Sequence, residues 1–148
     1  MKHKLHAIAG TTALLTILTF WVSTLISELF GSHAQITSVK TFVLYGMILL
    51  IPAMIATGAS GASLGKGWKL PVVGRKAKRM KIIAANGILI LMPSAFFLAS
   101  KAQAGAFDTM FYVVQAAEII AGAINITLLS LNMRDGLALR RRRKSAAK

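Results

Sequence analysis

One face of an expected helix over residues 109–131 carries the side chains best suited to chemistry. These polar or small residues are separated by three, four, three and seven positions: Gln115, Glu118, Gly122, Asn125 and Asn132. Such spacing keeps side chains on one side of an α-helix. At 1.5 Å per residue, Glu118 lies roughly 14 Å from the start of that helix, within an apolar stretch. An ionised carboxyl costs at least about 2.5 kcal/mol there, so we expect this face to point into a bundle or a wet cavity.

The residue pattern leaves two roles open for Glu118. A carboxyl inside a membrane can relay a proton or bind a cation or substrate. A protonated Glu118 can instead join helices through hydrogen bonds to neutral partners. The hydroxyl residues Thr19 and Ser23 are its expected partners if helix 5–30 packs on helix 109–131, and Asn86 is expected to meet Asn125. The predicted intramembrane polar site comprises Glu118, Gln115, Asn125, Asn86, Ser23 and Thr19.

Histidine and cysteine usage limits the cofactors and reactions to be considered. The absence of cysteine excludes disulfides, thiolate metal sites and iron–sulfur clusters. His6 is a possible ligand of a b-type haem, whereas His33 lies about 40 Å farther along the helix and cannot ligate the same haem. We find no nucleophile–base arrangement, no paired catalytic carboxylates and no zinc ligand set. We therefore expect a protein without catalytic or metal-binding residues, with haem b as the open cofactor.

The elements that position these residues are four long apolar stretches, over residues 5–30, 41–57, 82–100 and 109–131. The chain is 55% hydrophobic and only 15% charged, against about 45–50% and 25% in soluble domains. Each stretch has about the length that spans a bilayer, and continuous apolar runs favour helices. The first stretch exceeds the about 7–15 residues of a signal-peptide core, so we expect it to be retained. The prediction is an all-α four-helix transmembrane bundle at residues 1–133, followed by a basic tail at 134–148.

The distribution of positive charge predicts the orientation. Of 18 Lys and Arg residues, all but Lys40 and Lys101 fall at the N-terminus, in the connection between the second and third stretches, or in the tail. The positive-inside rule places those segments, and both termini, on the cytoplasmic side of what we expect to be a bacterial inner membrane. The basic run is expected to contact anionic lipids rather than nucleic acid, with an acidic partner protein as the alternative; it comprises Arg140, Arg141, Arg142, Arg143 and Lys144.

Two resemblances accompany these patterns. The segments FWVSTLISELFG, LIPAMIATGASG, PSAFFLASKAQAGAFDTMFYVVQAAE and LNMRDGL resemble a group of small bacterial inner-membrane proteins without an assigned activity. That resemblance implies the fold and the location only. The segment KLHAIAG resembles the start of four-helix haem-binding families, such as the membrane haem-containing protoporphyrinogen oxidases. This second resemblance implies a ligand role for His6.

These observations predict an integral inner-membrane protein that works as a non-enzymatic accessory or interaction component. Its polar interior would be centred on Glu118, and its partners would be lipids, a second copy of the chain or a larger membrane complex. Two alternatives remain open: a haem-binding redox protein using His6, and a small proton-linked carrier using Glu118.

Overall fold

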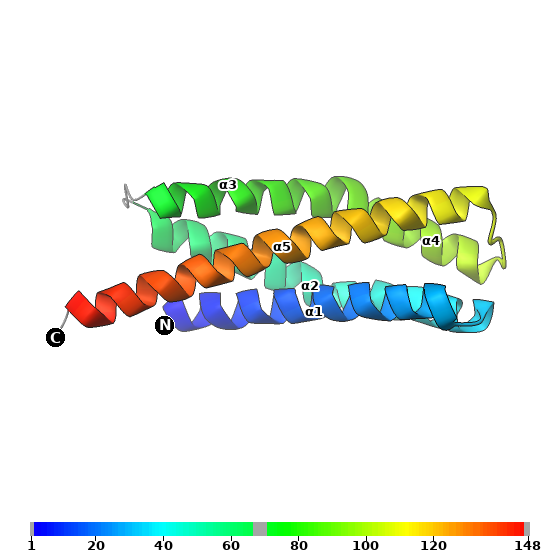
Figure 1. Cartoon of the computed structure of the whole chain (residues 1–148), viewed down its shortest axis with the longest axis horizontal. Helices are drawn as coiled ribbons and strands as arrows, with labels where there is room; N and C mark the ends of the chain where they lie inside the picture. Colours follow the sequence, from blue (N-terminus) through cyan, green and yellow to red (C-terminus); the bar gives the residue numbers. More distant parts are fainter. Residues whose placement is uncertain (1, 67–70, 147–148) are drawn as a thin grey trace.

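The computed structural model describes residues 2–66 and 71–146, apart from the side chains of residues 2, 3, 140, 142–144 and 146. The described chain is all-helical. Its elements are α1 (Lys2–Phe30), α2 (His33–Gly65), α3 (Pro71–Asn86), the π-helix η1 (Gly87–Leu91), α4 (Met92–Gln103) and α5 (Thr109–Ala146). Because α3, η1 and α4 follow one another without a break, these elements form four rods (Figure 1).

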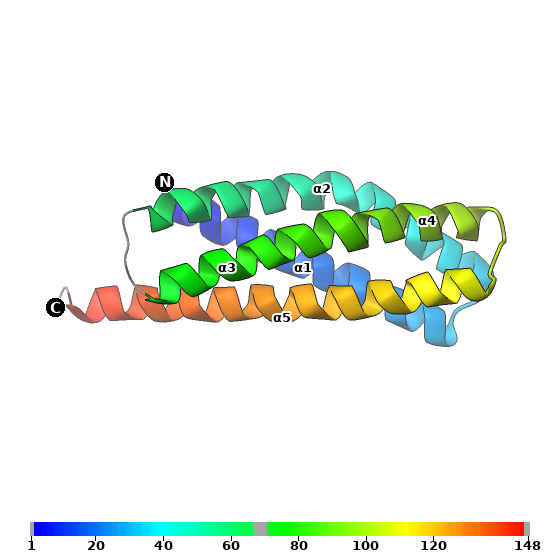
Figure 2. The same cartoon turned by 90° about the horizontal axis from the view of Figure 1, so that it is seen from above.

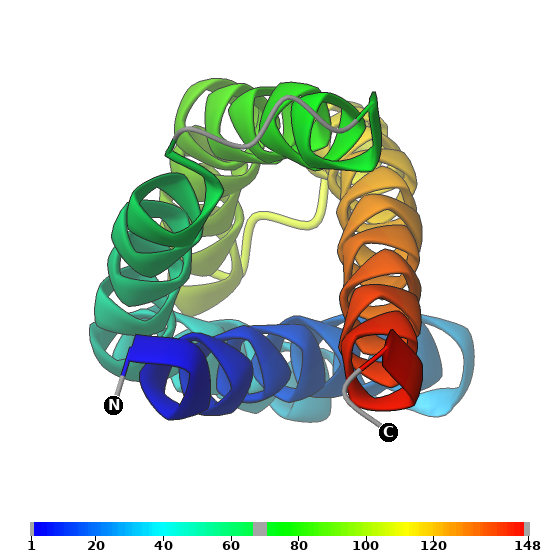
Figure 3. The same ribbon diagram turned by 90° about the vertical axis from the view of Figure 1, so that its left-hand side faces the viewer.

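The four rods are the sides of an elongated bundle that looks four-cornered along its long axis (Figure 3). α1 packs between α2 and α5, and the α3–η1–α4 rod packs against α2 and α5 on the other side (Figures 1 and 2). Both termini lie at one end, here called the basic end, and the turns at residues 31–32 and 104–108 form the far end. Neighbouring rods therefore run antiparallel, as short connections require.

Each rod is long and apolar enough to cross a membrane. The four candidate spans are Lys4–Phe30, His33–Gly65, Pro71–Gln103 and Thr109–Leu139. Large apolar side chains cover the outer faces of the bundle; examples are Ile8, 65% exposed, and Ile48, 75% exposed. Polar side chains such as Lys40 and Asn125 are instead buried inside. Water-soluble proteins bury apolar side chains and expose polar ones. The reverse arrangement seen here, together with the four candidate spans, indicates a multi-pass membrane protein.

The helices are longer than the apolar stretches that predicted them. The second stretch, expected over 41–57, is part of a helix over His33–Gly65, and the expected tail at 134–148 continues α5 to Ala146. At the start of α2, Ser32 forms a capping box with Gln35, in which each side chain bonds the other residue's backbone N–H. Apolar stretches mark only the part of a helix in hydrocarbon, whereas backbone hydrogen bonds and caps extend it into the polar interface.

The π-helix η1 ends two residues before Pro93. Pro93, near the start of α4, has no backbone N–H and cannot bond the carbonyl of Leu89 four residues earlier. A local widening of the helix accommodates such a lost bond. Asn86 lies just before the widened turn, on the side that faces α5.

The apolar core is a series of small clusters along the bundle. Ile17, Ile83 and Leu129 form one, Val43, Met47 and Ala95 a second. A third cluster near the far end contains Ile36, Leu98, Ala102 and Phe111. Polar groups are placed between these clusters, so that the interior alternates between apolar and polar zones.

Candidate functional site

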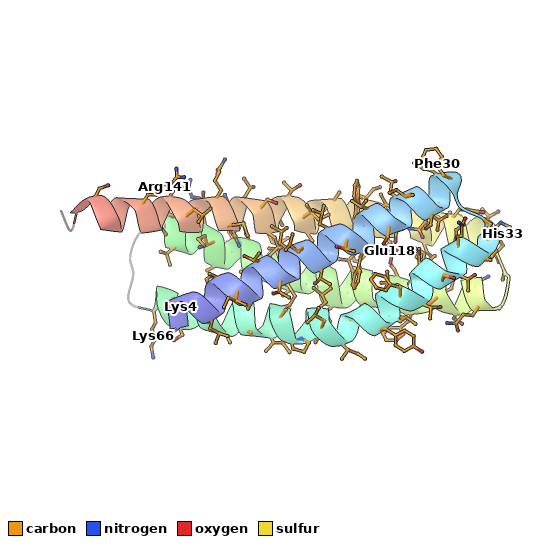
Figure 4. The ribbon with its side chains drawn as sticks, turned by 90° about the horizontal axis from the view of Figure 1, so that it is seen from below. Lys4, Phe30, His33, Lys66, Glu118 and Arg141 are labelled. Carbon is orange, nitrogen blue, oxygen red and sulfur yellow. The ribbon has the colours of Figure 1, made fainter. Side chains whose placement is uncertain are left out.

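Glu118 lies between the middle of the bundle and its far end (Figure 4), and it belongs to a cluster of charged and polar side chains from three helices. The side chain of Lys40 on α2 is only 1% exposed, and its Nζ donates to Glu118 Oε2 on α5 at 2.9 Å. Glu28 Oε1 on α1 lies 3.9 Å from the same Nζ. Gln115 Nε2 also donates to Glu118 Oε2, at 3.1 Å. We call Glu28, Lys40, Gln115 and Glu118 the charged cluster.

The far-end turn positions the charged cluster. Glu28 is in the last turn of α1, and Lys40 is about two turns into α2. Only residues 31 and 32 separate these helices, and Gly31 N donates back to Ser27 O at 2.9 Å, which closes α1 tightly. The turn therefore folds α2 back along α1 and brings Lys40 alongside Glu28. On α5, the three-residue spacing of Gln115 and Glu118 puts them on one face.

The charged cluster contains one more carboxylate than ammonium groups. Two buried oxygens in it, Glu28 Oε1 and Gln115 Oε1, have no hydrogen-bond partner within the described part of the chain. The side chains of Glu28 and Gln115 are 9% and 3% exposed. Buried acceptors are normally paired, so the cluster has capacity for a further donor.

A small cavity adjoins Glu118. Its volume is about 70 Å³, and its walls come from α1, α2, η1, α4 and α5. Phe20, Trp21 and Thr24 of α1 line it together with Glu118, and the remaining walls are apolar. Trp21 is held in place because its Nε1 donates to the carbonyl of Ile119 at 2.9 Å. The carboxyl of Glu118 thus borders both Lys40 and an aromatic, largely apolar space.

Two asparagines join α3 to α5 nearer the middle of the bundle. Asn86 Nδ2 donates to Asn125 Oδ1 and to the carbonyl of Ala121, both at 2.8 Å. Asn125, 2% exposed, donates to the carbonyl of Ile83 at 3.4 Å. The contact expected between Asn86 and Asn125 is therefore present.

A third polar group connects the same two helices near the basic end. Arg79 on α3 donates to Asp135 Oδ2 on α5 at 2.7 Å and lies 3.4 Å from Asn132 Oδ1. Asn132 Nδ2 in turn donates to the carbonyl of Lys76 at 3.4 Å. The Arg79–Asp135 pair was not predicted from the sequence, because residues 71–81 were expected to form a loop.

The expected partners of Glu118 on α1 are not its partners. Thr19 Oγ1 donates to the carbonyl of Leu15 at 2.8 Å, and Ser23 Oγ donates to that of Phe20 at 3.1 Å. Both hydroxyls are thus used within their own helix, a bond that Ser and Thr readily form. They line a shallow hollow of about 380 Å³ on α1, together with Leu18, Val22 and Ile26.

The two charged residues near Glu118, which are Lys40 and Glu28, were not predicted as site residues. Lys40 was counted as a positive charge outside the membrane, and Glu28 lies at the end of the first apolar stretch. The signal that identifies them is the presence of charge within helices that are otherwise apolar, since such residues usually pair inside a bundle.

His6 lies near the basic end and contacts α2. Its Nδ1 is 3.0 Å from Ser60 Oγ, and a Cβ added to Gly61 would lie 3.1 Å from its Cε1. This contact fixes the ring against α2 and does not test haem binding, which stays a prediction. Among the residues that the structure describes, no group of three or more His, Asp or Glu residues is arranged to hold a metal ion.

The basic run falls mostly outside the described side chains. Arg141 is exposed on α5, while the side chains of Arg140, Arg142, Arg143 and Lys144 lie outside the described residues. Their expected contact with anionic lipid stays a prediction.

Comparison with known proteins identifies no relative. No protein-family model matches this chain, and no curated protein and no solved structure matches it.

Proposed function

We propose that this chain is a non-enzymatic inner-membrane protein that acts as an accessory or interaction component of a membrane assembly. The observation that supports this role is the pairing of interior polar groups across helices at three levels. Lys40 pairs with Glu118, Asn86 with Asn125, and Arg79 with Asp135. The role of this polar interior, centred on Glu118, is to hold the four rods in one arrangement.

Such pairing favours a rigid body with fixed outer faces. Removing one partner of a buried ion pair costs about 3–5 kcal/mol, so alternative packings of these helices are strongly disfavoured. A rigid bundle presents constant lateral surfaces, which a second copy or another membrane protein can recognise. The basic end, which we place at the cytoplasmic face, would add contacts with anionic lipid through Arg140–Lys144.

Native mass spectrometry of the protein extracted from its own membrane in mild detergent tests the accessory role. We expect a defined complex, either a homo-oligomer or a fixed stoichiometry with another protein. Chemical crosslinking in the intact membrane before extraction supplies the control for complexes lost in detergent. A monomer in both measurements would overturn the proposal.

The excess carboxylate of the charged cluster favours a second candidate, a small proton-linked carrier that uses Glu118. Flux into liposomes containing a pH-sensitive dye separates the two candidates. The accessory role predicts that wild type and Glu118→Gln match protein-free liposomes at two external pH values. A proton flux that Glu118→Gln abolishes would replace the accessory role with the carrier.

A further inference from the structure

An ammonium group without a counter-charge lies where α3 packs against α5 near the basic end. Lys76 on α3 is half-buried, and its Nζ would lie 3.1 Å from a Cβ added to Gly136 on α5. Within the described part of the chain, this Nζ forms neither a hydrogen bond nor an ion pair. Asp135 is the only acidic residue near the basic end, and it is already 2.7 Å from Arg79 and 3.6 Å from Arg134. The charge of Lys76 is therefore left for a ligand to neutralise.

Arg79, one turn farther along α3, has donors to spare. Both of its side-chain hydrogen bonds within the described residues, to Asp135 Oδ2 and Asn132 Oδ1, come from Nη1. A guanidinium carries five N–H groups, so those of Nε and Nη2 stay available. The three-residue spacing puts Lys76 and Arg79 on one face of α3, and both contact α5. Together they can bind one oxyanion, Lys76 as a point charge and Arg79 through directed donors.

The depth of these residues in the bundle matches that of lipid phosphates. Gly136 lies about 40 Å along α5 from Thr109, and Lys76 lies about as far from Gln103 at the end of α4. The hydrocarbon core of a bilayer is about 30 Å thick, and the headgroup layers extend it to about 40–45 Å. With the far end at one surface, Lys76 and Gly136 therefore lie in the headgroup layer of the other. Gly136, which has no side chain, leaves room for a headgroup beside the backbone.

The charge of α3 selects among phospholipids. The helix has no acidic residue and carries five basic ones, Arg75, Lys76, Lys78, Arg79 and Lys81. Phosphatidylcholine neutralises its phosphate with its own choline, whereas phosphatidic acid leaves the phosphate without a counter-charge. Basic sites between transmembrane helices are known to bind anionic headgroups. The surroundings of Lys76 therefore favour a lipid with a net negative charge.

We propose that Lys76 and Arg79 bind the phosphate of one anionic phospholipid beside Gly136, at the contact between α3 and α5. This site is stoichiometric, and it differs from the collective attraction expected between the basic run and a charged membrane surface, which salt screens. The proposal goes beyond the accessory function and does not depend on it, because a monomer and a complex would both contain the site.

Native mass spectrometry with a short-chain lipid tests this site. The purified full chain, stripped of its own lipid in detergent, is titrated with dihexanoyl phosphatidic acid, which adds a known mass. We expect saturation at one bound lipid per chain. Dihexanoyl phosphatidylcholine tests the need for net negative charge, and inorganic phosphate tests whether the phosphate can come from solution. Both are expected to bind at least about tenfold more weakly.

Variants at one depth in the bundle separate the site from general surface charge. Lys76→Gln is expected to weaken lipid binding at least about tenfold, because it removes a charged donor. Lys78→Gln is the matched control, since it removes the same charge from an exposed position on another face of α3, and it should bind as the wild type does. Gly136→Leu keeps every charge but covers Lys76 Nζ, so it should weaken binding as Lys76→Gln does.

Three results would overturn the proposal. The first is equal binding of phosphatidic acid by Lys76→Gln and Lys78→Gln, which would reduce the site to surface charge. Lys76→Gln keeps the Arg79–Asp135 pair, and Gly136→Leu provides a second test of the same contact. The second is binding of inorganic phosphate as tight as that of the lipid, which would make a free anion the occupant. The third is a wild-type titration that does not saturate at one lipid per chain.

Discussion

Lys40 joins three helices through one side chain. It extends from α2, donates to Glu118 on α5 and lies near Glu28 on α1. Taking an ammonium group out of water is expensive, and the nearby carboxylates offset that cost only while they are in place. The Lys40–Glu118 pair is therefore expected to contribute to the uniqueness of the packing more than to its net stability.

A double-mutant cycle tests this pair. Lys40→Met is expected to lower the free energy of unfolding by about 3–5 kcal/mol, because it leaves two carboxylates facing each other in the bundle. Lys40→Met/Glu118→Gln should recover much of that loss. Thermal unfolding in detergent, followed by circular dichroism, measures both. Additive losses in the double variant would show that the two residues do not interact.

Asp108 provides a pH-dependent contact outside the membrane spans. Its Oδ1 accepts from Phe111 N at 3.0 Å at the start of α5, and its Oδ2 accepts from Lys101 Nζ. The hydrogen bond from Lys101, and then that from Phe111 N–H, hold the pKa of Asp108 below its ordinary value. A lowered pKa in the folded state means stability that is present above the ordinary pKa and lost as the pH falls through the folded one.

The Asp108→Asn variant isolates this effect. It retains an oxygen for Phe111 N–H but loses the ion pair with Lys101. The wild type should unfold at a higher temperature than the variant above the ordinary pKa of an aspartate, and the two should converge as the pH falls through the lowered pKa of Asp108. Melting temperatures across that range measure the difference. A constant gap at every pH would contradict the assignment.

At the scale of elements, α1 approaches its neighbours by placing aromatic rings over glycines. A Cβ added to Gly46 of α2 would lie 2.3 Å from Phe20 Cζ, and one added to Gly122 of α5 would lie 2.9 Å from Trp21 Cδ1. Small residues let transmembrane helices come close together. These two positions therefore set the distances of α2 and α5 from α1 and, with them, the geometry of the charged cluster.

Gly122→Ala tests this close approach. Trp21 is tethered to the carbonyl of Ile119, so the added methyl group must break that bond or push α5 away, at a cost of about 1–3 kcal/mol. Gly58→Ala is the matched control, since nothing lies within 4 Å of its added Cβ, and it should stabilise the helix by about 0.5–1 kcal/mol. Thermal unfolding measures both changes. Equal effects at the two positions would contradict the packing argument.

At the scale of the whole molecule, positive charge gathers at one end. Lys4, Lys66 and Arg141 lie there, whereas Phe30 and His33 lie at the far end (Figure 4). Within the described side chains, the far end contributes only Lys40, which is buried, and Lys101, which pairs with Asp108. This asymmetry favours insertion with the basic end in the cytoplasm.

Cysteine labelling tests the orientation, because the chain has no cysteine of its own. Ala104→Cys places a thiol in the far-end turn, and Ser145→Cys places one near the end of α5. In intact cells, a membrane-impermeant maleimide is expected to label Ala104→Cys at once and Ser145→Cys only after permeabilisation. The reverse pattern would place the basic end outside.

The basic end is expected to recognise anionic lipid. Each Lys or Arg near an anionic membrane surface gains about 1 kcal/mol. Nanodiscs with anionic lipid should therefore raise the melting temperature above that in neutral nanodiscs, and high salt should remove the difference because it screens surface charge. Neutralising Arg140–Arg143 with glutamine should have the same effect as salt. A lipid response that survives both changes would contradict the assignment.

The amino-acid sequence by itself determined the all-helical class, the four spans and the gathering of positive charge at one end. These properties depend on local composition and on the backbone's need for internal hydrogen bonds in lipid. Helical periodicity also placed Gln115, Glu118 and Asn125 on one face of a helix. It did not predict which residues that face contacts. Only the tertiary structure brought Glu28, Lys40 and Glu118 together, because they come from three helices whose relative rotation is decided by packing. Thr19 and Ser23 likewise could not be assigned partners from the sequence, since each donates to a carbonyl of its own helix and not to a residue across the bundle.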